Sequence, residues 1–247
     1  MIPQIIHYCW LSDDPIPTDL EKCMKTWKEH LPDYEFIKWD FTRFDKNSSK
    51  WVHQAFEAKK YAFAADYIRL YALYHYGGIY LDMDVEVIKS LNPFLELSTM
   101  IGFENSDKQK LEAAVVGVEK HSKWVNTCLS YYENRSFIHN DGTFDVKVLP
   151  YVLRDQLIES GYNLKSVSSI DEAKRVSDME LPVFPFDFFS PKSYLTGKIE
   201  KTCNTVTIHN FSGSWQSKNE IVRLWLKRHL PLCVQIVIRY AKNIIKI

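Results

Sequence analysis

Two carboxylates, Asp82 and Asp84, stand two residues apart in the stretch YAFAADYIRLYALYHYGGIYLDMD, which covers residues 61–84. Apolar and polar side chains alternate from Ile79 to Val87, so the pattern predicts a strand on which both carboxylates share one face. Two carboxylates this close repel each other unless a cation lies between them. The pair therefore indicates a divalent-metal site that grips a phosphorylated ligand. The alternative is a charge pair that simply faces solvent.

A second charged pair precedes this strand on a predicted helix over residues 52–76. Asp66 and Arg69 are three residues apart, so they share one face of the helix. Gly77 and Gly78 follow, as is typical where a helix ends in a residue at positive φ. The helix and its glycine turn would thus hold the charged pair beside the predicted strand. The alternative is an intrahelical salt bridge at the surface, which would be worth only ~0.3–0.5 kcal/mol.

Together, the helix, the glycine turn and the strand resemble the core motif of the family-32 glycosyltransferases, which is similar to the glucosyltransferase domain of large clostridial toxins. The resemblance implies an α/β fold of the GT-A type, with a mostly parallel central sheet flanked by helices. It also implies a nucleotide diphosphate sugar as donor, a manganese or magnesium ion, and retention of the anomeric configuration. The matching residues are Ala65, Asp66, Arg69, Leu73, Gly77, Gly78, Tyr80, Asp82 and Asp84.

The resemblance extends to both ends of the chain. Residues 2–10 match the family's amino-terminal pattern, in which the strand end holds the nucleotide base, so Trp10 either stacks on the base or packs in the core. Residues 209–215 match its carboxy-terminal signature, which implies that Ser214 lies near the diphosphate and Trp215 over the ligand. His209 would supply an imidazole to the ion, and mixed oxygen and imidazole ligation suits manganese better than calcium. Otherwise His209 is a hydrogen-bonded surface residue.

The resemblance thus implies a role for each candidate residue. Asp82, Asp84 and His209 would bind the ion. Asp66 would accept hydrogen bonds from hydroxyls of the donor sugar, and Arg69 would bridge the sugar and the phosphates. The expected catalytic residues are Asp66, Arg69, Asp82 and Asp84, and the expected substrate-binding residues are Trp10, Ala65, Asp66, Arg69, Tyr80, Asp82, Ser214 and Trp215.

The remaining elements follow from hydrophobic periodicity and capping signals. A strand, a helix and a strand are predicted in succession at the amino terminus, and the helix-length connection predicts a parallel pair. Prolines at Pro185 and Pro191 exclude the segment between them from a central strand. Strands are predicted over residues 4–10, 34–39, 100–104, 111–118 and 205–208, and helices over residues 18–31, 122–132 and 150–160.

Composition narrows the class of protein. A chain of 247 residues with 46% apolar residues can bury a full core, and its formal net charge of zero argues against a nucleic-acid partner. The five scattered cysteines predict reduced thiols and a cytoplasmic location. We expect one GT-A domain over residues 1–218. The basic, partly amphipathic segment 219–247 either packs on that domain or lies on the inner face of a membrane.

The function expected from these patterns is transfer of a hexose from a nucleotide diphosphate sugar to an oligo- or polysaccharide. UDP-galactose is the expected donor, by analogy with relatives that build capsular or surface polysaccharide, and a lipid-linked acceptor is one alternative. Two other classes of function remain open. A metal-dependent phosphohydrolase could use the same aspartates, and a non-catalytic module could bind sugar or metal through them.

Overall fold

The computed structural model describes residues 1–106 and 108–213 of the chain. Its strands are β1 (Ile5–Cys9), β2 (Glu35–Trp39), β3 (Gly78–Leu81), β4 (Val85–Val87), β5 (Thr99–Met100), β6 (Val115–Val118), β7 (Asn163–Ser166), β8 (Glu180–Val183) and β9 (Thr207–His209). Its helices are α1 (Thr18–His30), α2 (Lys50–Glu57), α3 (Tyr61–Tyr76), α4 (Lys123–Ser130), α5 (Leu149–Glu159), α6 (Ile170–Ala173) and α7 (Phe186–Phe189), with 3-10 turns η1 (Lys46–Ser48) and η2 (Asn92–Phe94).

A five-stranded sheet in the order β2-β1-β3-β6-β5 forms the centre of the molecule. β1 pairs in parallel with β2 and with β3, as the helix-length connections require. β6 is antiparallel to both β3 and β5. The predicted α/β class is confirmed, but the sheet is mixed, because the chain turns back between β5 and β6 instead of crossing over through a helix.

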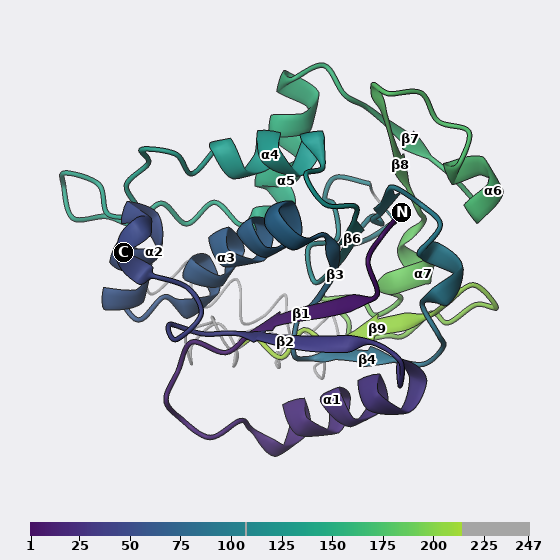
Figure 1. Cartoon of the computed structure of the whole chain (residues 1–247), viewed down its shortest axis with the longest axis horizontal. Coiled ribbons are helices and arrows are strands. Elements are labelled where there is room, and N and C mark those ends of the chain that lie inside the picture. The colour runs from purple at the N-terminus through teal and green to yellow at the C-terminus, as the bar shows by residue number, and fades with distance from the viewer. Residues whose placement is uncertain (107, 214–247) are drawn as a thin grey trace, which may run out of the picture.

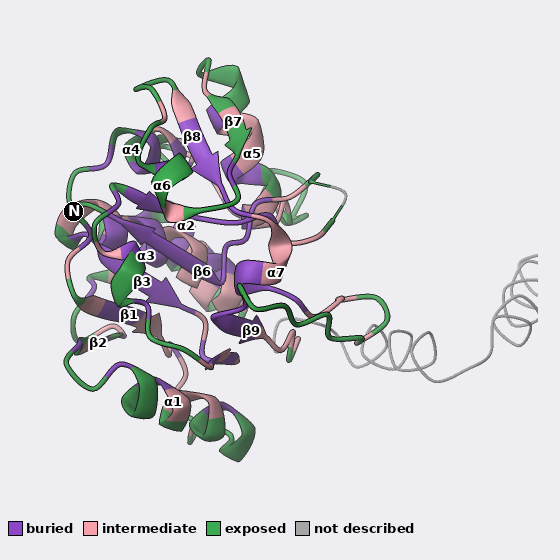
Figure 2. Ribbon diagram, turned by 90° about the vertical axis from the view of Figure 1, so that its right-hand side faces the viewer, coloured by how far each residue is buried: buried purple, intermediate pink, exposed green. Residues whose placement is uncertain are grey.

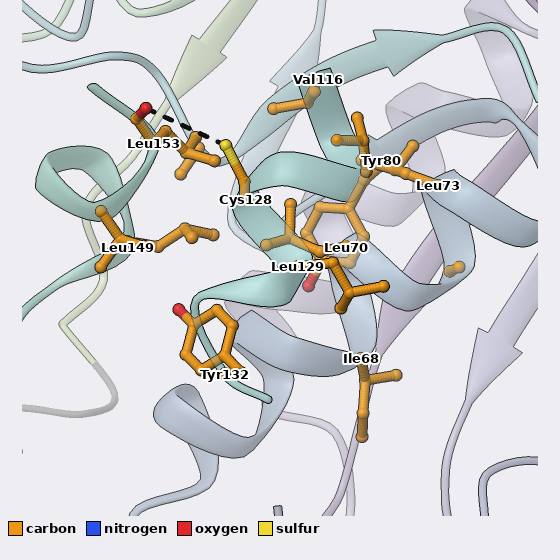
Figure 3. Close-up of a cluster of buried hydrophobic side chains, with 14 of the residues drawn as sticks. Ile68, Leu70, Leu73, Tyr80, Val116, Cys128, Leu129, Tyr132, Leu149 and Leu153 are labelled. Atoms are coloured by element: carbon orange, nitrogen blue, oxygen red, sulfur yellow. Dashed lines mark hydrogen bonds between the residues drawn. The ribbon is translucent and has the colours of Figure 1, made fainter. Parts of the chain in front are cut away.

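Two hydrophobic cores cover the two faces of this sheet. Helices α3 and α4 lie on one face, and α1 lies on the other (Figure 1). The first core contains Leu70, Leu73, Tyr80 and Cys128, which Figure 3 shows together. The second core contains the odd-numbered residues Ile79, Leu81, Met83, Val85 and Val87. The predicted alternation therefore holds, with the odd-numbered side chains facing one core.

The glycine turn after α3 brings the helix directly onto the sheet. Gly77 and Gly78 both have positive φ, 66° and 97°, as the helix-end pattern predicts. A Cβ on Gly78 would lie 2.8 Å from the carbonyl oxygen of Ile5, so no other residue fits against β1 there. The turn consequently fixes where β3 begins, and with it the position of the carboxylates at the end of β3.

Two predicted elements are interrupted in the structure. The helix predicted over residues 52–76 is two helices, α2 and α3, separated at Lys59, which has a φ of 56°. The strand predicted from Ile79 to Val87 is also divided, because residues 82–84 form a turn in which Val85 N–H donates to the Asp82 carbonyl at 3.0 Å. The strand β4 that follows this turn leaves the central sheet and pairs with β9.

The carboxy-terminal half contains elements that periodicity did not predict. β7 and β8 form a separate parallel pair, and Pro182 lies within β8. The segment that follows Pro185 is the short helix α7, so its exclusion from a central strand is confirmed. The last strand, predicted over residues 205–208, is β9. Figure 2 shows β3, β6 and β9 buried in the interior, whereas the outer face of α1 is exposed.

In the part of the chain that the structure describes, no helix combines the length and the apolar character needed to cross a membrane. The cysteines in this part, Cys9, Cys23, Cys128 and Cys203, are free thiols. The predicted basic segment 219–247 lies outside the described residues.

Candidate metal site

Asp82 and Asp84 lie in the turn between β3 and β4. The Asp82 N–H donates to the carbonyl oxygen of Ala114 at 2.9 Å, which ties the start of the turn to the segment before β6. At the other end of the turn, Asp84 Oδ2 accepts a hydrogen bond of 2.7 Å from the backbone N–H of Ser212. The backbone of Asp82 and the carboxylate of Asp84 are thus both anchored to other segments of the chain.

β9 brings His209 to this turn. His209 is opposite Val85 in the antiparallel β4–β9 pair, and the N–H of Asn210 donates to the carbonyl oxygen of Asp84 at 3.0 Å. His209 Nε2 lies 3.6 Å from Asp84 Oδ1. One ligand atom from each of Asp82, Asp84 and His209 lies within 4.8 Å of the others. The structure therefore joins two pieces of the sequence pattern that lie far apart in the chain.

Arg69 connects the helix pair to the metal candidates. Its Nη2 lies 2.9 Å from Asp82 Oδ1 and 3.4 Å from Asp66 Oδ1. Its Nη1 donates to the carbonyl oxygen of Ala113, and its guanidinium lies 4.3 Å from the ring centroid of Tyr80. The Arg69 side chain is only 6% exposed. Its main partner is therefore Asp82, and the pair with Asp66 is buried rather than a surface salt bridge.

Asp66 and Tyr80 flank this guanidinium. Burial raises the pKa of Asp66 to about 7, although Arg69 opposes the shift. The Tyr80 side chain lies in the core, and its hydroxyl donates to Asp82 Oδ1 at 3.1 Å. The buried Tyr80 thus holds the carboxylate of Asp82 through this hydrogen bond. Asp66, with 13% of its side chain exposed, is more accessible than Tyr80.

His209 lies between two carboxylates. Its Nδ1 is 3.4 Å from Glu112 Oε1, on the opposite side of the ring from Asp84. Burial alone would lower the pKa of His209, but the charges of Asp84 and Glu112 outweigh this effect and raise it to about 9. The ring of Phe211 also packs against the imidazole, with 3.9 Å between the ring centroids.

Sequence analysis missed Glu112. It is 1% exposed, and its Oε1 accepts a hydrogen bond of 2.7 Å from the N–H of Ala114. Burial would raise the pKa of Glu112, but the neighbouring His209 more than compensates and holds it below its usual range. The detectable signal was a single glutamate within the otherwise apolar run LEAAVVGV, because a buried carboxylate requires a partner.

The other predicted site residues are placed as follows. Trp10 is partly exposed just after β1, and its Nε1–H donates to the carbonyl oxygen of Asp14 at 2.9 Å. Ala65 lies on α3, partly buried against the first core. Ser214 and Trp215 lie outside the described residues, so their predicted contacts with the diphosphate and the ligand stay predictions.

The donor set fits a divalent ion. Two carboxylates and one imidazole converge, and mixed oxygen and nitrogen ligands suit manganese. The side chains of Asp84 and His209 are each 13% exposed and that of Asp82 is 29% exposed, so a ligand can reach the group from one side. Like charges in this arrangement are stabilised when a cation binds between them. We therefore assign Asp82, Asp84 and His209 as the residues that would hold such an ion.

A known protein family matches part of the chain. The family described as "Glycosyltransferase sugar-binding region containing DXD motif" matches residues 17–101. The matched region includes Asp66, Arg69, Asp82 and Asp84, but it ends before Glu112 and His209. The resemblance to DXD-containing glycosyltransferases is thus confirmed for that region.

Individual relatives are similar to this chain over different shares of its length. Inositol phosphoceramide mannosyltransferase 3 of Schizosaccharomyces pombe is 35% identical over 98 residues, which are 38% of this chain and 27% of that protein. Inositol phosphoceramide mannosyltransferase 2 of the same organism is 25% identical over 239 residues, which are 95% of this chain and 64% of that protein. The chain therefore spans between about a quarter and two thirds of the length of these two relatives.

A search of solved structures found the PaToxG glycosyltransferase. It has 18% sequence identity and a TM-score of 0.48, and the match covers 64% of this chain and 70% of that one.

Proposed function

We propose that this chain is a metal-dependent hexosyltransferase with a GT-A-type fold and a nucleotide diphosphate sugar as donor. The observation that supports it most is the convergence of Asp82, Asp84 and His209 at one point. The first two belong to the region that matches DXD-containing glycosyltransferases, and the third comes from β9, more than a hundred residues later. A charge pair that merely faced solvent would not need a largely buried histidine beside it.

The physical problem of the reaction is the charge of the leaving group. Cleavage of the bond at the anomeric carbon leaves negative charge on the nucleoside diphosphate, while the sugar becomes oxocarbenium-like. Asp82, Asp84 and His209 would hold a divalent ion at this point, and its positive charge would offset the charge that develops on the diphosphate.

The chain's own side chains orient the donor. Arg69 holds the carboxylate of Asp82 in one position through a 2.9 Å ion pair. Asp66 is close enough to share that guanidinium and has a partly exposed carboxylate, which suits it to accept hydrogen bonds from sugar hydroxyls. In this proposal the anomeric configuration is retained, because the leaving phosphate assists the incoming acceptor.

The relatives change the order in which donors are tested. Both yeast proteins are named mannosyltransferases, and neither name mentions galactose or a capsule. We therefore place a mannose donor ahead of UDP-galactose. The same names mention an inositol phosphoceramide. A lipid-linked saccharide or a glycolipid headgroup is accordingly the preferred acceptor, ahead of a capsular polysaccharide.

The test is a donor screen on the purified full-length chain. GDP-mannose, UDP-galactose, UDP-glucose and the free nucleotides are added with Mn²⁺ or with EDTA, and thermal shift and nucleotide release are measured with and without acceptor glycolipid. The proposal predicts stabilisation by one donor in Mn²⁺ only, and nucleotide release that depends on the acceptor. Release that is equally fast without acceptor would instead indicate a phosphohydrolase. Binding without release would indicate a non-catalytic module.

A pair of matched variants shows whether the site carries the activity. Asp84→Asn keeps the shape of the side chain but removes its charge, so Mn²⁺-dependent turnover should fall at least ~100-fold. Glu86→Gln removes a carboxylate from β4 two residues further along, away from the cluster, and should leave turnover within about twofold of wild type. Equal turnover in the two variants would contradict the assignment.

A further inference from the structure

The three consecutive residues before β6, Glu112 to Ala114, contact three different parts of the candidate site. Glu112 Oε1 lies 3.4 Å from His209 Nδ1. The carbonyl oxygen of Ala113 accepts a hydrogen bond from Arg69. The carbonyl oxygen of Ala114 accepts a hydrogen bond of 2.9 Å from the N–H of Asp82. This short segment therefore contacts the candidate site at three points, through His209, Arg69 and the backbone of Asp82.

The position of Glu112 itself is well determined. Its backbone N–H donates to the carbonyl oxygen of Gly102 at 2.7 Å. Its side-chain Oε1 accepts the N–H of Ala114 at 2.7 Å, which fixes the direction of the carboxylate. Side chain and backbone are thus both anchored, so Glu112 can act as a fixed point for a neighbouring group.

We propose that Glu112 is a positioning residue for the metal site: it holds the His209 imidazole so that Nε2 faces Asp82 and Asp84. The inference depends on the proposed metal-dependent function and adds to it a residue that lies outside the region matched by the DXD family. Metal-binding histidines commonly donate their second ring N–H to a carboxylate, which fixes the tautomer and makes the imidazole a better ligand.

The geometry around His209 supports this role. Nδ1 is buried and, among the described residues, makes no hydrogen bond of good geometry, with Glu112 Oε1 as its carboxylate neighbour at 3.4 Å. A buried N–H without a partner is costly. Contacts in ligand-free sites are often long and tighten when the ligand binds.

Direct measurement of Mn²⁺ affinity tests the proposal without catalysis. Free Mn²⁺ is titrated by electron paramagnetic resonance with the full-length chain and its variants. Glu112→Gln keeps the size of the side chain but loses its charge, and it should weaken Mn²⁺ binding about 10–100-fold, the usual effect of losing such a carboxylate. Asp145→Asn is the matched control, since it removes another largely buried carboxylate, which pairs with Arg135 and not with a residue of the candidate site. It should change the affinity less than about threefold.

A double-mutant cycle separates positioning from a general loss of negative charge. In the His209→Ala background, Glu112→Gln should cause no further loss of Mn²⁺ affinity beyond about twofold. An equal loss in both backgrounds, or an equal loss in Asp145→Asn, would overturn the proposal. Wild-type affinity in Glu112→Gln would overturn it as well.

Failure of this inference can be distinguished from failure of the proposed function. If Asp84→Asn and His209→Ala lose Mn²⁺ binding while Glu112→Gln keeps it, only the positioning role is wrong. If all of these variants bind Mn²⁺ like wild type, the assignment of the metal ligands is wrong. If Glu112→Gln does not fold, ¹⁵N spectra of the wild-type histidines with Zn²⁺ decide the question. They should show His209 coordinated through Nε2 with a proton on Nδ1, and coordination through Nδ1 would refute the proposal.

Discussion

At the scale of single residues, Arg69 is the cation on which the buried carboxylates depend. Burial alone would lower the pKa of Arg69, but Asp82, Tyr80 and Asp66 reverse this effect and keep it charged. A buried ion pair adds little net stability, whereas removing one partner leaves an uncompensated charge. The arginine therefore matters less as a source of stability than as the counter-ion that favours the ionised form of Asp82.

Replacing Arg69 with methionine should destabilise the protein by about 3–5 kcal/mol at pH 8, because Asp66 and Asp82 lose their counter-ion. The loss should be smaller at pH 5, since a carboxylate with a raised pKa can then take up a proton. Urea unfolding at the two pH values measures both effects. The double variant Arg69→Met/Asp66→Asn is the control and should recover part of the loss. A loss below about 1 kcal/mol at pH 8 would mean that the pairs act like surface salt bridges.

Asp66→Ala should weaken binding of the donor sugar nucleotide more than binding of the free nucleotide. The reason is that the proposed partners of Asp66 are sugar hydroxyls, which the free nucleotide lacks. Calorimetric titration of both ligands in Mn²⁺ gives the two affinities, and Asp66→Asn, which keeps one acceptor oxygen, should have an intermediate effect. Equal losses for both ligands would assign Asp66 a purely structural role beside Arg69.

At the scale of elements, the buried His7 connects the end of α3 to the central sheet through hydrogen bonds. The His7 ring receives a hydrogen bond from Trp39 Nε1–H at its Nδ1, at 3.1 Å, and its Nε2 lies 2.8 Å from the carbonyl oxygen of Gly77. His7 is therefore neutral, with its proton on Nε2, and it binds a backbone carbonyl. This contact links β1, β2 and the glycine turn that leads to Asp82.

The same contact predicts how stability changes with pH. Burial lowers the pKa of His7 from 6.5 to about 4, against the smaller opposing effect of the Gly77 carbonyl. The unfolded chain then takes up a proton that the folded protein does not. The free energy of unfolding therefore keeps its full value with respect to His7 above pH 6.5. It decreases as the pH falls toward 4, by roughly 3 kcal/mol in total.

Urea unfolding of wild type and His7→Gln between pH 7 and pH 4 measures this contribution. The variant should show the weaker pH dependence, whereas a variant of the exposed His53, His53→Gln, should retain the wild-type slope. Parallel pH profiles for wild type and His7→Gln would show that His7 protonates freely in the folded protein.

Helices, strands and turns were predictable from the sequence where neighbouring residues alone determine them. The glycines after α3, the alternating strand and the helices α1, α4 and α5 follow from propensity and periodicity. The break at Lys59 carries no local signal, because a lysine at positive φ is held by its surroundings. The turn at residues 82–84 was also not predictable, since it exists because β4 pairs with β9 rather than with the central sheet.

The site was predictable to a similar extent. Asp82 and Asp84 were found from residue type and spacing, and His209 from the family resemblance of residues 209–215. The structure places the three together. The role of Glu112 and the hydrogen bond from Ser212 to Asp84 depend on contacts between distant segments. No periodicity could have revealed them. Arg69 was found, but its main partner Asp82 was not, because the pair spans a helix and a strand end.

At the scale of the whole molecule, the described residues form two cores on either side of one sheet, and the candidate site lies at the end of β3. The basic segment beyond residue 218 lies outside these residues, so its association with membranes stays a prediction. Seven Lys/Arg and one Glu lie between residues 218 and 247, amid apolar side chains. Such a composition suits a helix that lies on anionic lipid, where a lipid-linked acceptor would be found.

The full-length chain should therefore sediment with anionic vesicles more than with neutral ones, and added salt should weaken the effect. A chain that ends before Pro231 is the comparison, because it lacks the apolar run that follows. Equal sedimentation of the two chains would mean that the tail packs on the domain instead.

The central claim is that Asp82, Asp84 and His209 hold one divalent ion that binds the diphosphate of a sugar nucleotide. Anomalous diffraction at the manganese edge, from crystals grown with Mn²⁺ and the nucleotide selected by the donor screen, tests it most directly. The claim predicts one strong peak about 2.0–2.3 Å from an imidazole nitrogen of His209, in contact with both carboxylates and a phosphate oxygen. A peak elsewhere, or an imidazole that points away from the ion, would contradict it.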